Sequence, residues 1–148
     1  MSDQRPSVVI TTEIYCPSNP GRSGTAAVLT SGEHKKVLSY LLDATTNNRA
    51  EIQSALTAIA ALKRPAIVTI RCSSKYLADG INEGIASWKA ANWRTKAKKP
   101  VSNADLWQAL EVAMTAHEIR AEFCTASERS AIAAEAQQVA RDLIAAAA

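Results

Sequence analysis

The fold of this chain is decided by the stretch TTNNRAE, residues 45–51, and by the amphipathic run into which it leads. Polar, turn-forming residues give way there to apolar side chains that recur at helical spacing. This pattern predicts a helix over residues 48–63, with Glu51 in its first turn. A glutamate there also has an ordinary explanation, because the positive end of the helix dipole favours a nearby acid by roughly 0.3–1 kcal/mol. The apolar residues of the run are Ile52, Ala55, Leu56, Ile59 and Leu62.

Length and composition predict one domain with a proper core. The chain has 148 residues, 47% of them apolar, and a net charge of only +3. No apolar run approaches the ~20 residues of a membrane span, and the N-terminal MSDQRPS lacks the apolar stretch of a signal peptide. We therefore expect no membrane association and a cytoplasmic location. We expect a single domain over residues 1–148, with a flexible N-terminus at 1–7 and the end of the last helix at 143–148.

Three cysteines, Cys16, Cys72 and Cys124, are widely spaced along the chain. This number and spacing fit neither a disulfide framework nor a zinc site of the CxxC type. We expect buried or half-buried free thiols, and no thiol nucleophile.

The order of strand and helix patterns indicates an α/β fold. Three strands with turn-rich connections come first, and helices then alternate with two further strands. The fourth strand is short and apolar, as in a strand that pairs in parallel after a helical crossover. The expected strands are residues 8–15, 25–30, 34–43, 66–72 and 118–124, with turns at 17–24 and 31–33. The expected helices are residues 48–63, 75–84, 85–92, 104–115 and 130–147.

Several segments together carry a resemblance to the ribonuclease HI family. The stretch TTNNRAE resembles the family's TTNNRxE signature, and the basic block WKAANWRTKAKKPVSNADLW (88–107) is the most specific match. The other matches are SNPGRSG (18–24), SSKYLADGI (73–81) and QQVAR (137–141). The resemblance implies a ribonuclease H fold of the bacterial type with a basic protrusion. In that fold, helices flank a five-stranded mixed sheet of three antiparallel strands followed by parallel ones.

The resembled family cleaves phosphodiesters with two divalent cations about 3.5–4 Å apart, which several anionic oxygens must surround. Four carboxylates provide these oxygens in the family, and a mobile histidine assists. Carried over residue by residue, the carboxylate positions fall on Glu13, Glu51, Ser73 and Gln137, and the histidine position falls on Ser127. Two acids of four are therefore retained, and Glu13 is one methylene longer than the family's aspartate.

The resemblance therefore implies a damaged metal site. Serine and glutamine are neutral, and Mg²⁺ depends on carboxylate oxygens in near-ideal geometry. We expect Glu13 and Glu51 to hold Mg²⁺ or Mn²⁺ weakly, if they hold it at all. Three other acids lie near the lost positions, but none is a good replacement. Asp142 is about 140° round its helix from Gln137, Asp79 is expected to face solvent, and Glu128 is expected to aid the N-terminus of the last helix.

The binding apparatus is better preserved. A charge run is ordinarily a solvated surface, but the block from Trp88 to Lys99 contains no acid and resembles the protrusion that grips the DNA strand of a hybrid. Asn92 replaces a common glycine there, and asparagine tolerates a left-handed turn. By the same resemblance, the amide side chains of Asn19, Asn47 and Asn48 contact the RNA strand from the minor groove. Thr46 and Asn103 match a small pocket that holds a phosphate of the DNA strand. The predicted nucleic-acid-binding residues are Asn19, Thr46, Asn47, Asn48, Ser74, Lys75, Trp88, Lys89, Trp93, Arg94, Lys96, Lys98, Lys99 and Asn103.

The sequence leaves three functions open. The first is a protein that binds an RNA/DNA hybrid or a related duplex, with its hydrolase activity lost or strongly impaired. The second is an active but atypical metal-dependent endoribonuclease that works through Glu13 and Glu51. The third is a scaffold on the same fold, whose face has been recruited for a protein partner; the low net charge leaves this option open because the basic patch is local.

Overall fold

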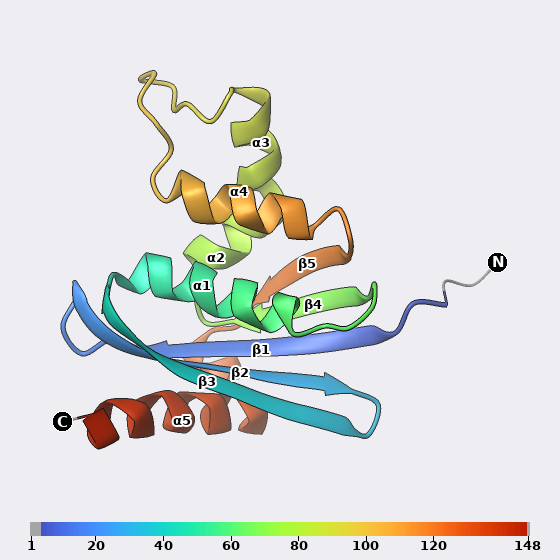
Figure 1. Cartoon of the computed structure of the whole chain (residues 1–148), viewed down its shortest axis with the longest axis vertical. Coiled ribbons are helices and arrows are strands. Elements are labelled where there is room, and N and C mark those ends of the chain that lie inside the picture. The colour runs from blue at the N-terminus through green and yellow to red at the C-terminus, as the bar shows by residue number, and fades with distance from the viewer. Residues whose placement is uncertain (1–3, 148) are drawn as a thin grey trace.

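The computed structural model describes residues 4–147 and consists of a five-stranded sheet with helices on both faces (Figure 1). The sheet order is β3-β2-β1-β4-β5. The first three strands pair antiparallel, whereas β4 pairs parallel to β1 and β5 pairs parallel to β4. This arrangement confirms the predicted fold class. The strands are β1 (Ser7–Tyr15), β2 (Gly21–Ser31), β3 (His34–Thr45), β4 (Ile67–Cys72) and β5 (Glu118–Phe123).

The helices cover the sheet unequally. The last helix, α5, lies on one face of the sheet, while α1 lies on the other (Figure 1). The chain between α3 and α4 forms an extension that stands away from the sheet at the top of Figure 1. The helices are α1 (Asn47–Ala60), α2 (Lys75–Asp79), the π-helical turn η1 (Gly80–Gly84), α3 (Ile85–Ala90), α4 (Ala104–Ala113), the 3₁₀ turn η2 (Ala126–Glu128) and α5 (Ala131–Ala147).

Two hydrophobic clusters hold these layers together. The larger lies between the sheet and the helices α1, α2 and α4, and its fully buried members include Ile52, Leu77 and Trp107. The smaller contains Val28 of β2 and Ala136 of α5. The sheet is therefore packed on both faces, and this packing holds the ends of β1 and β4 in fixed positions.

The second strand begins four residues earlier than predicted, at Gly21 instead of residue 25. The segment 17–24 was expected to be a turn because of its prolines and glycines. Gly24 instead serves a close approach of backbones, since a Cβ at this position would overlap the carbonyl oxygen of Ala140 in α5. The glycine lets α5 lie directly on the sheet.

The start of α1 also differs from the prediction. Thr46 is the N-cap, and its side chain accepts a hydrogen bond from the backbone N–H of Arg49. Glu51 is therefore in the second turn and not the first, so the prediction of a helix-end glutamate was wrong. The helix ends at Ala60 instead of residue 63.

The predicted helix over residues 75–84 consists of α2 followed by the π-helical turn η1. A Cβ at Gly80 would overlap the ring of Trp107, and a Cβ at Gly84 would approach the ring of Trp88 to 2.7 Å. The two glycines therefore let tryptophan rings pack directly on the backbone of this segment. The other predicted boundaries of helices and strands fall within two residues of those observed.

The predicted flexible N-terminus at residues 1–7 is partly wrong. Ser7 begins β1 and pairs with Ile67, whose N–H also donates to the carbonyl oxygen of Pro6. Residues 1–3 and 148 lie outside the described residues. Within residues 4–147, no helix is long and apolar enough to cross a membrane.

Candidate active site and nucleic-acid interface

The fold brings three of the predicted catalytic positions into direct contact. Glu13 lies near the end of β1, and the parallel register that pairs Thr12 with Cys72 puts Ser73 beside it. Gln137 reaches the same carboxylate from α5. Glu51, from α1, is close enough for its carboxyl group to interact electrostatically with Glu13. Four of the five positions that the sequence predicted as catalytic therefore form one site; the fifth, Ser127, has a different partner, Thr125.

Glu13 accepts hydrogen bonds from both substituted positions. Ser73 Oγ donates to Glu13 Oε2 at 2.5 Å. The amide of Gln137, in the orientation that satisfies both of its ends, donates to Glu13 Oε1 at 2.9 Å and to the carbonyl oxygen of Ile14 at 3.2 Å. Where the family has two further acids, this chain therefore has two hydrogen-bond donors, and each donates to a different oxygen of Glu13.

A third partner of Glu13, a cation, was not predicted from the sequence. Arg129, in the connection between η2 and α5, places Nη2 3.3 Å from Glu13 Oε1. The Glu13 residue is only 4% exposed, and the Arg129 side chain is 33% exposed. Ser127, at the family's histidine position, shares a hydrogen bond of 3.0 Å with Thr125 instead. The only available signal was that a basic residue lies two positions beyond Ser127.

Burial raises the pKa of both retained acids, and the effect on Glu51 is large. Burial and, to a smaller extent, the charge of the nearby Glu13 together raise the pKa of Glu51 to about 8. The Oε2 atom of Glu51 is buried without a hydrogen-bond partner. Burial also raises the pKa of Glu13, although the hydrogen bond from Ser73 and the charge of Arg129 oppose this effect. Glu51 is therefore largely protonated near neutral pH.

These residues do not fit a pair of hard cations. Mg²⁺ requires several oxygen ligands that carry negative charge, but the oxygens of Glu13 are occupied by donors and a cation lies against them. Within the described part of the chain, no three His, Cys, Asp or Glu residues are grouped so that they could hold a metal ion.

The nearby acids have other partners. Asp79 is exposed and pairs with Lys75 at 3.0 Å, and Asp142 accepts a hydrogen bond from Gln138 at 2.8 Å. Glu128 closes a capping box with Thr125 at η2, so the expectation that it serves the start of α5 was wrong. None of the three contacts Glu13 or Glu51.

We expect Glu51→Gln to change the pH dependence of stability. Because the folded-state pKa is raised from 4.5 to about 8, the folded protein binds this proton more tightly than the unfolded chain does. The contribution of protonated Glu51 to the free energy of unfolding is fully present below pH ~4.5, and it is lost as the pH rises through about 8. Urea unfolding should show a steeper loss of unfolding free energy between pH 5 and 8.5 in the unmodified protein than in the variant. Parallel pH profiles would contradict this expectation.

We also expect no pair of Mg²⁺ ions to bind at Glu13 and Glu51 at millimolar concentration. The physical reason is the loss of about two negative charges where up to four positive charges would gather. Isothermal titration calorimetry with Mg²⁺ and with Mn²⁺ should show at most one weak site. Two sites tighter than millimolar would contradict the prediction, and Glu51→Gln serves as the control for binding elsewhere on the protein.

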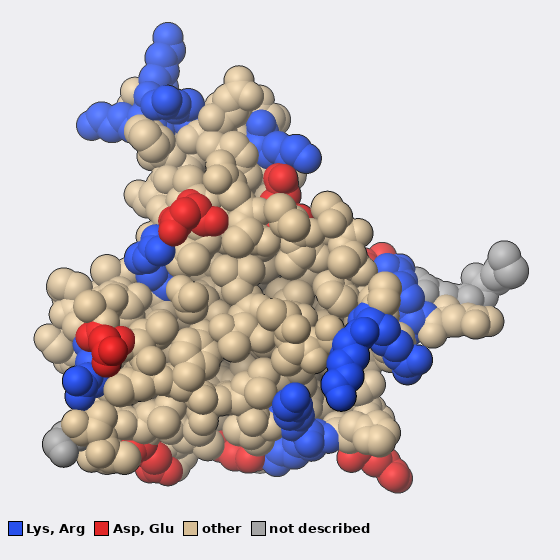
Figure 2. All heavy atoms as spheres, in the orientation of Figure 1, with Lys and Arg blue, Asp and Glu red and all other residues tan. Residues whose placement is uncertain are grey.

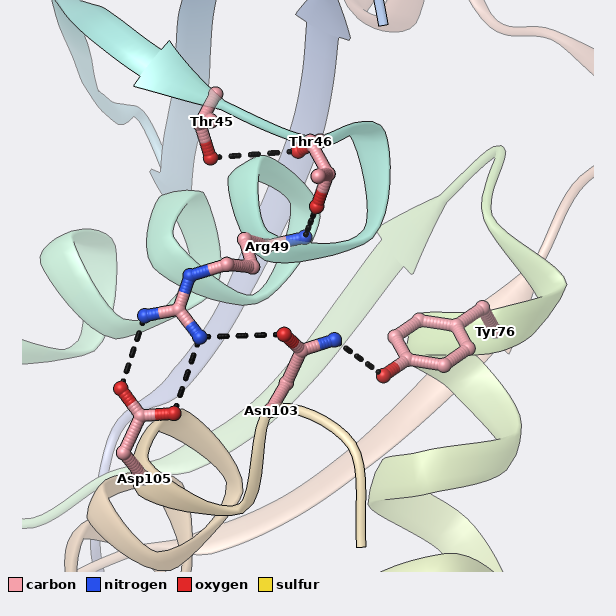
Figure 3. Close-up of polar contacts among 6 residues, drawn as sticks. All are labelled: Thr45, Thr46, Arg49, Tyr76, Asn103 and Asp105. Carbon is pink, nitrogen blue, oxygen red and sulfur yellow. Dashed lines mark hydrogen bonds and ion pairs between the residues drawn. The ribbon is translucent and has the colours of Figure 1, made fainter. Parts of the chain in front are cut away.

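A polar cluster lies where the resemblance predicts a phosphate pocket (Figure 3). Arg49 donates to Asn103 Oδ1 at 3.1 Å and to both carboxylate oxygens of Asp105, at 3.0 and 2.9 Å. Asn103 Nδ2 donates to the hydroxyl oxygen of Tyr76 at 2.9 Å. Asn103 has a left-handed backbone with φ of 60°. These contacts join α1, α2 and the start of α4, and they fix Thr46 and Asn103 in place.

The predicted amide contacts lie around the start of α1. Asn47 and Asn48 are exposed, and the backbone N–H of Asn47 donates to Asn19 Oδ1 at 3.0 Å. Ser74 caps α2 by accepting from the N–H of Leu77 at 3.0 Å. Asn48 therefore presents a free-standing side chain one turn before Glu51, on the same side of the helix.

The basic block lies mainly in the extension between α3 and α4. Space-filling atoms of Lys and Arg gather at the tip of this extension (Figure 2). Lys96, Lys98 and Lys99 are exposed, whereas Lys89 lies 3.7 Å from Glu111. Asn92 has a φ of 55°, which confirms the predicted left-handed turn.

Trp88 and Trp93 face inward more than expected. Both are partly buried against the larger hydrophobic cluster, and their ring centroids are 6.3 Å apart. The ring centroid of Trp88 is also 5.3 Å from that of Trp107. The tryptophans thus anchor the extension, and the lysines occupy its surface. Trp88 still lines a groove that contains Arg94 and Lys96.

The three cysteines are free, with Cys72 buried and Cys16 and Cys124 partly buried, which confirms the expectation. Burial raises the pKa of Cys72 to about 12. This thiol is therefore protonated and unreactive as a nucleophile.

The sheet order and the position of Glu13 and Glu51 define an α/β protein of the ribonuclease H-like class. Residues 5–144 match the family described as RNase H. The chain is 49% identical over 117 residues to a protein named Ribonuclease H from Afipia carboxidovorans, covering 79% of this chain and 78% of that one. It is 41% identical over 141 residues to Ribonuclease H of Rhodopseudomonas palustris, covering 95% and 90% of the two chains. The chain therefore belongs to the ribonuclease H family.

Solved structures agree on the fold. LC9-RNase H1, described as a type 1 RNase H with the type 2 active-site motif, has a TM-score of 0.83 at 21% identity, covering 99% of this chain and 75% of that chain. LC11-RNase H1 in complex with RNA/DNA hybrid has a TM-score of 0.71 at 18% identity, covering 95% and 98%.

Proposed function

We propose that this protein binds RNA/DNA hybrids and has lost, or retains only weakly, the two-metal hydrolase activity of its family. The observation that carries the second part is the set of partners on Glu13, which comprises hydrogen bonds from a serine hydroxyl and a glutamine amide and an ion pair with an arginine. A carboxylate whose oxygens are bound in this way offers little to a divalent ion.

Three features support the binding part of the proposal. Family membership provides the fold, and LC11-RNase H1 is described in complex with such a hybrid. The amides of Asn19, Asn47 and Asn48 surround the start of α1, where they suit the shallow minor groove and its 2′-hydroxyls. The exposed lysines of the extension suit a phosphate backbone.

Hybrid binding in the presence and absence of metal tests this proposal. A fluorescently labelled RNA/DNA hybrid should bind with the same affinity in EDTA as in Mg²⁺ or Mn²⁺, because the proposed contacts are made by protein side chains and not through a metal ion. Cleavage of the hybrid should be absent in EDTA and absent or very slow in Mg²⁺ or Mn²⁺. Metal-dependent affinity or ordinary turnover would contradict the proposal.

An active but atypical endoribonuclease is the second candidate. The retained Glu51 and the names of the curated relatives favour it. Cleavage that Mn²⁺ supports and Glu51→Gln abolishes would establish this function. A protein that neither cleaves nor binds hybrid at low salt would instead favour the scaffold for a protein partner.

A further inference from the structure

The side chain of Arg129 places a positive charge beside Glu13, at the centre of the site. Arg129 comes from the connection between η2 and α5, 116 positions beyond Glu13 in sequence, and its Nη2 lies 3.3 Å from Glu13 Oε1. The pair joins a residue that is 4% exposed to a side chain that is 33% exposed. The guanidinium therefore contacts a buried carboxylate, while a third of the Arg129 side chain remains exposed.

Most donors of Arg129 are unused. A guanidinium has five N–H groups in a rigid planar fork. Among residues 4–147, the one side-chain partner found for Arg129 is Glu13. The exposed part of the fork can therefore accept a second anion with two oxygens in one plane, which is the geometry that arginine recognises in phosphate.

The charge of the site permits such an anion. Ser73 and Gln137 are neutral, and Arg129 balances Glu13, so the repulsion that an intact set of acids would exert on a phosphate is largely absent. The site also adjoins the proposed interface, because Asn48 lies one turn before Glu51 on α1.

We infer that Arg129 is a built-in cation that neutralises Glu13 and binds one backbone phosphate of the nucleic-acid duplex at the former catalytic centre. This inference rests on the proposed hybrid binding and adds a contact to it. Because the Arg129 side chain binds the phosphate directly, this contact does not require divalent ions.

The salt dependence of binding distinguishes a phosphate contact from a purely structural ion pair. Affinity for a labelled RNA/DNA hybrid is measured by fluorescence anisotropy in EDTA over a series of NaCl concentrations. Arg129→Gln should flatten the plot of log K against log salt by about 0.9, the value for one phosphate, and should weaken binding about five- to tenfold at 0.1 M salt. Arg129→Lys should retain most of the slope because it keeps the charge.

Two further variants control for stability and for net charge. Glu13→Gln with Arg129→Gln removes the ion pair without leaving an unpaired acid, and it should show the same flattened slope. Arg64→Gln removes an exposed arginine beyond the end of α1 and should leave the slope unchanged.

The possible failures are separable by the same titrations. Unmodified protein that binds hybrid with the same slope as folded Arg129→Gln would overturn the phosphate contact and leave the proposed function standing. Unmodified protein that does not bind hybrid at low salt would overturn both.

Discussion

Restoring the family's acids should restore cleavage. We expect the combination of Glu13→Asp, Ser73→Asp, Gln137→Asp and Arg129→Gln to raise Mg²⁺-dependent hydrolysis of an RNA/DNA hybrid by roughly 10²–10³-fold or more over the unmodified chain. The first three changes return carboxylate ligands, and the fourth removes the cation that now lies against Glu13. The three acids without the arginine change should recover less activity, because Arg129 would still compete for the carboxylates.

The control for this experiment is Glu51→Gln in the restored background. It should abolish the recovered cleavage, because it removes one acid without altering the fold. Ordinary turnover by the unmodified chain, lost on Glu51→Gln alone, would contradict the prediction and establish the enzyme hypothesis instead. The assay therefore separates the two principal hypotheses with one substrate.

The second large effect concerns the extension between α3 and α4. Replacing Lys96, Lys98 and Lys99 together with alanine should weaken hybrid binding and flatten its salt dependence. At about 0.9 per phosphate neutralised, three contacts amount to a slope change of up to about 2.7, and to an affinity loss of roughly 10²–10³-fold at 0.1 M salt. Anisotropy titrations at several NaCl concentrations measure both quantities.

A matched variant controls for net charge. Lys36, Lys63 and Arg64 are exposed, and the two lysines line a hollow with Val8 at the far end of the sheet from Glu13. Their combined replacement with alanine removes the same charge and should leave the slope nearly unchanged. Asn48→Ala should reduce the preference for hybrid over DNA duplex without altering the slope, since it removes a groove contact and no charge. Equal losses in the two triple variants would leave the extension as a solvated surface.

Much of the fold was predictable from local pattern. The strands were found because β-branched and apolar runs end in turn residues, and their order agrees with the resemblance over about residues 8–141. The start of β2 was not found because it depends on a tertiary contact, whereas the start of α1 was predicted within one residue. Gly24 looks like a turn residue until α5 lies against it, and Thr46 competes with its polar neighbours for the cap.

The site was predictable only in part. The contact of Ser73 and Gln137 with Glu13 follows from the family's arrangement of its acids. The role of Arg129 does not, because an arginine in a polar segment gives no periodic signal and its partner is distant in sequence. The inward orientation of Trp88 and Trp93 was also hidden, since aromatic residues among lysines suit either a core or a nucleic-acid face.

The glycines under the tryptophan rings have a consequence for how this surface can evolve. The ring of Trp107 packs on the backbone of Gly80, and the ring of Trp88 packs on the backbone of Gly84. These contacts attach the inner side of the extension to the core. Among the described residues, no hydrogen bond or ion pair joins the side chains of Lys96, Lys98 and Lys99 to the rest of the protein, although the backbone of Lys98 and Lys99 bonds to Thr95. Charges can therefore be gained, lost or exchanged on the outer side without loosening the extension. Substitutions on the outer side of the extension can therefore change which nucleic acid it binds without changing how the extension folds.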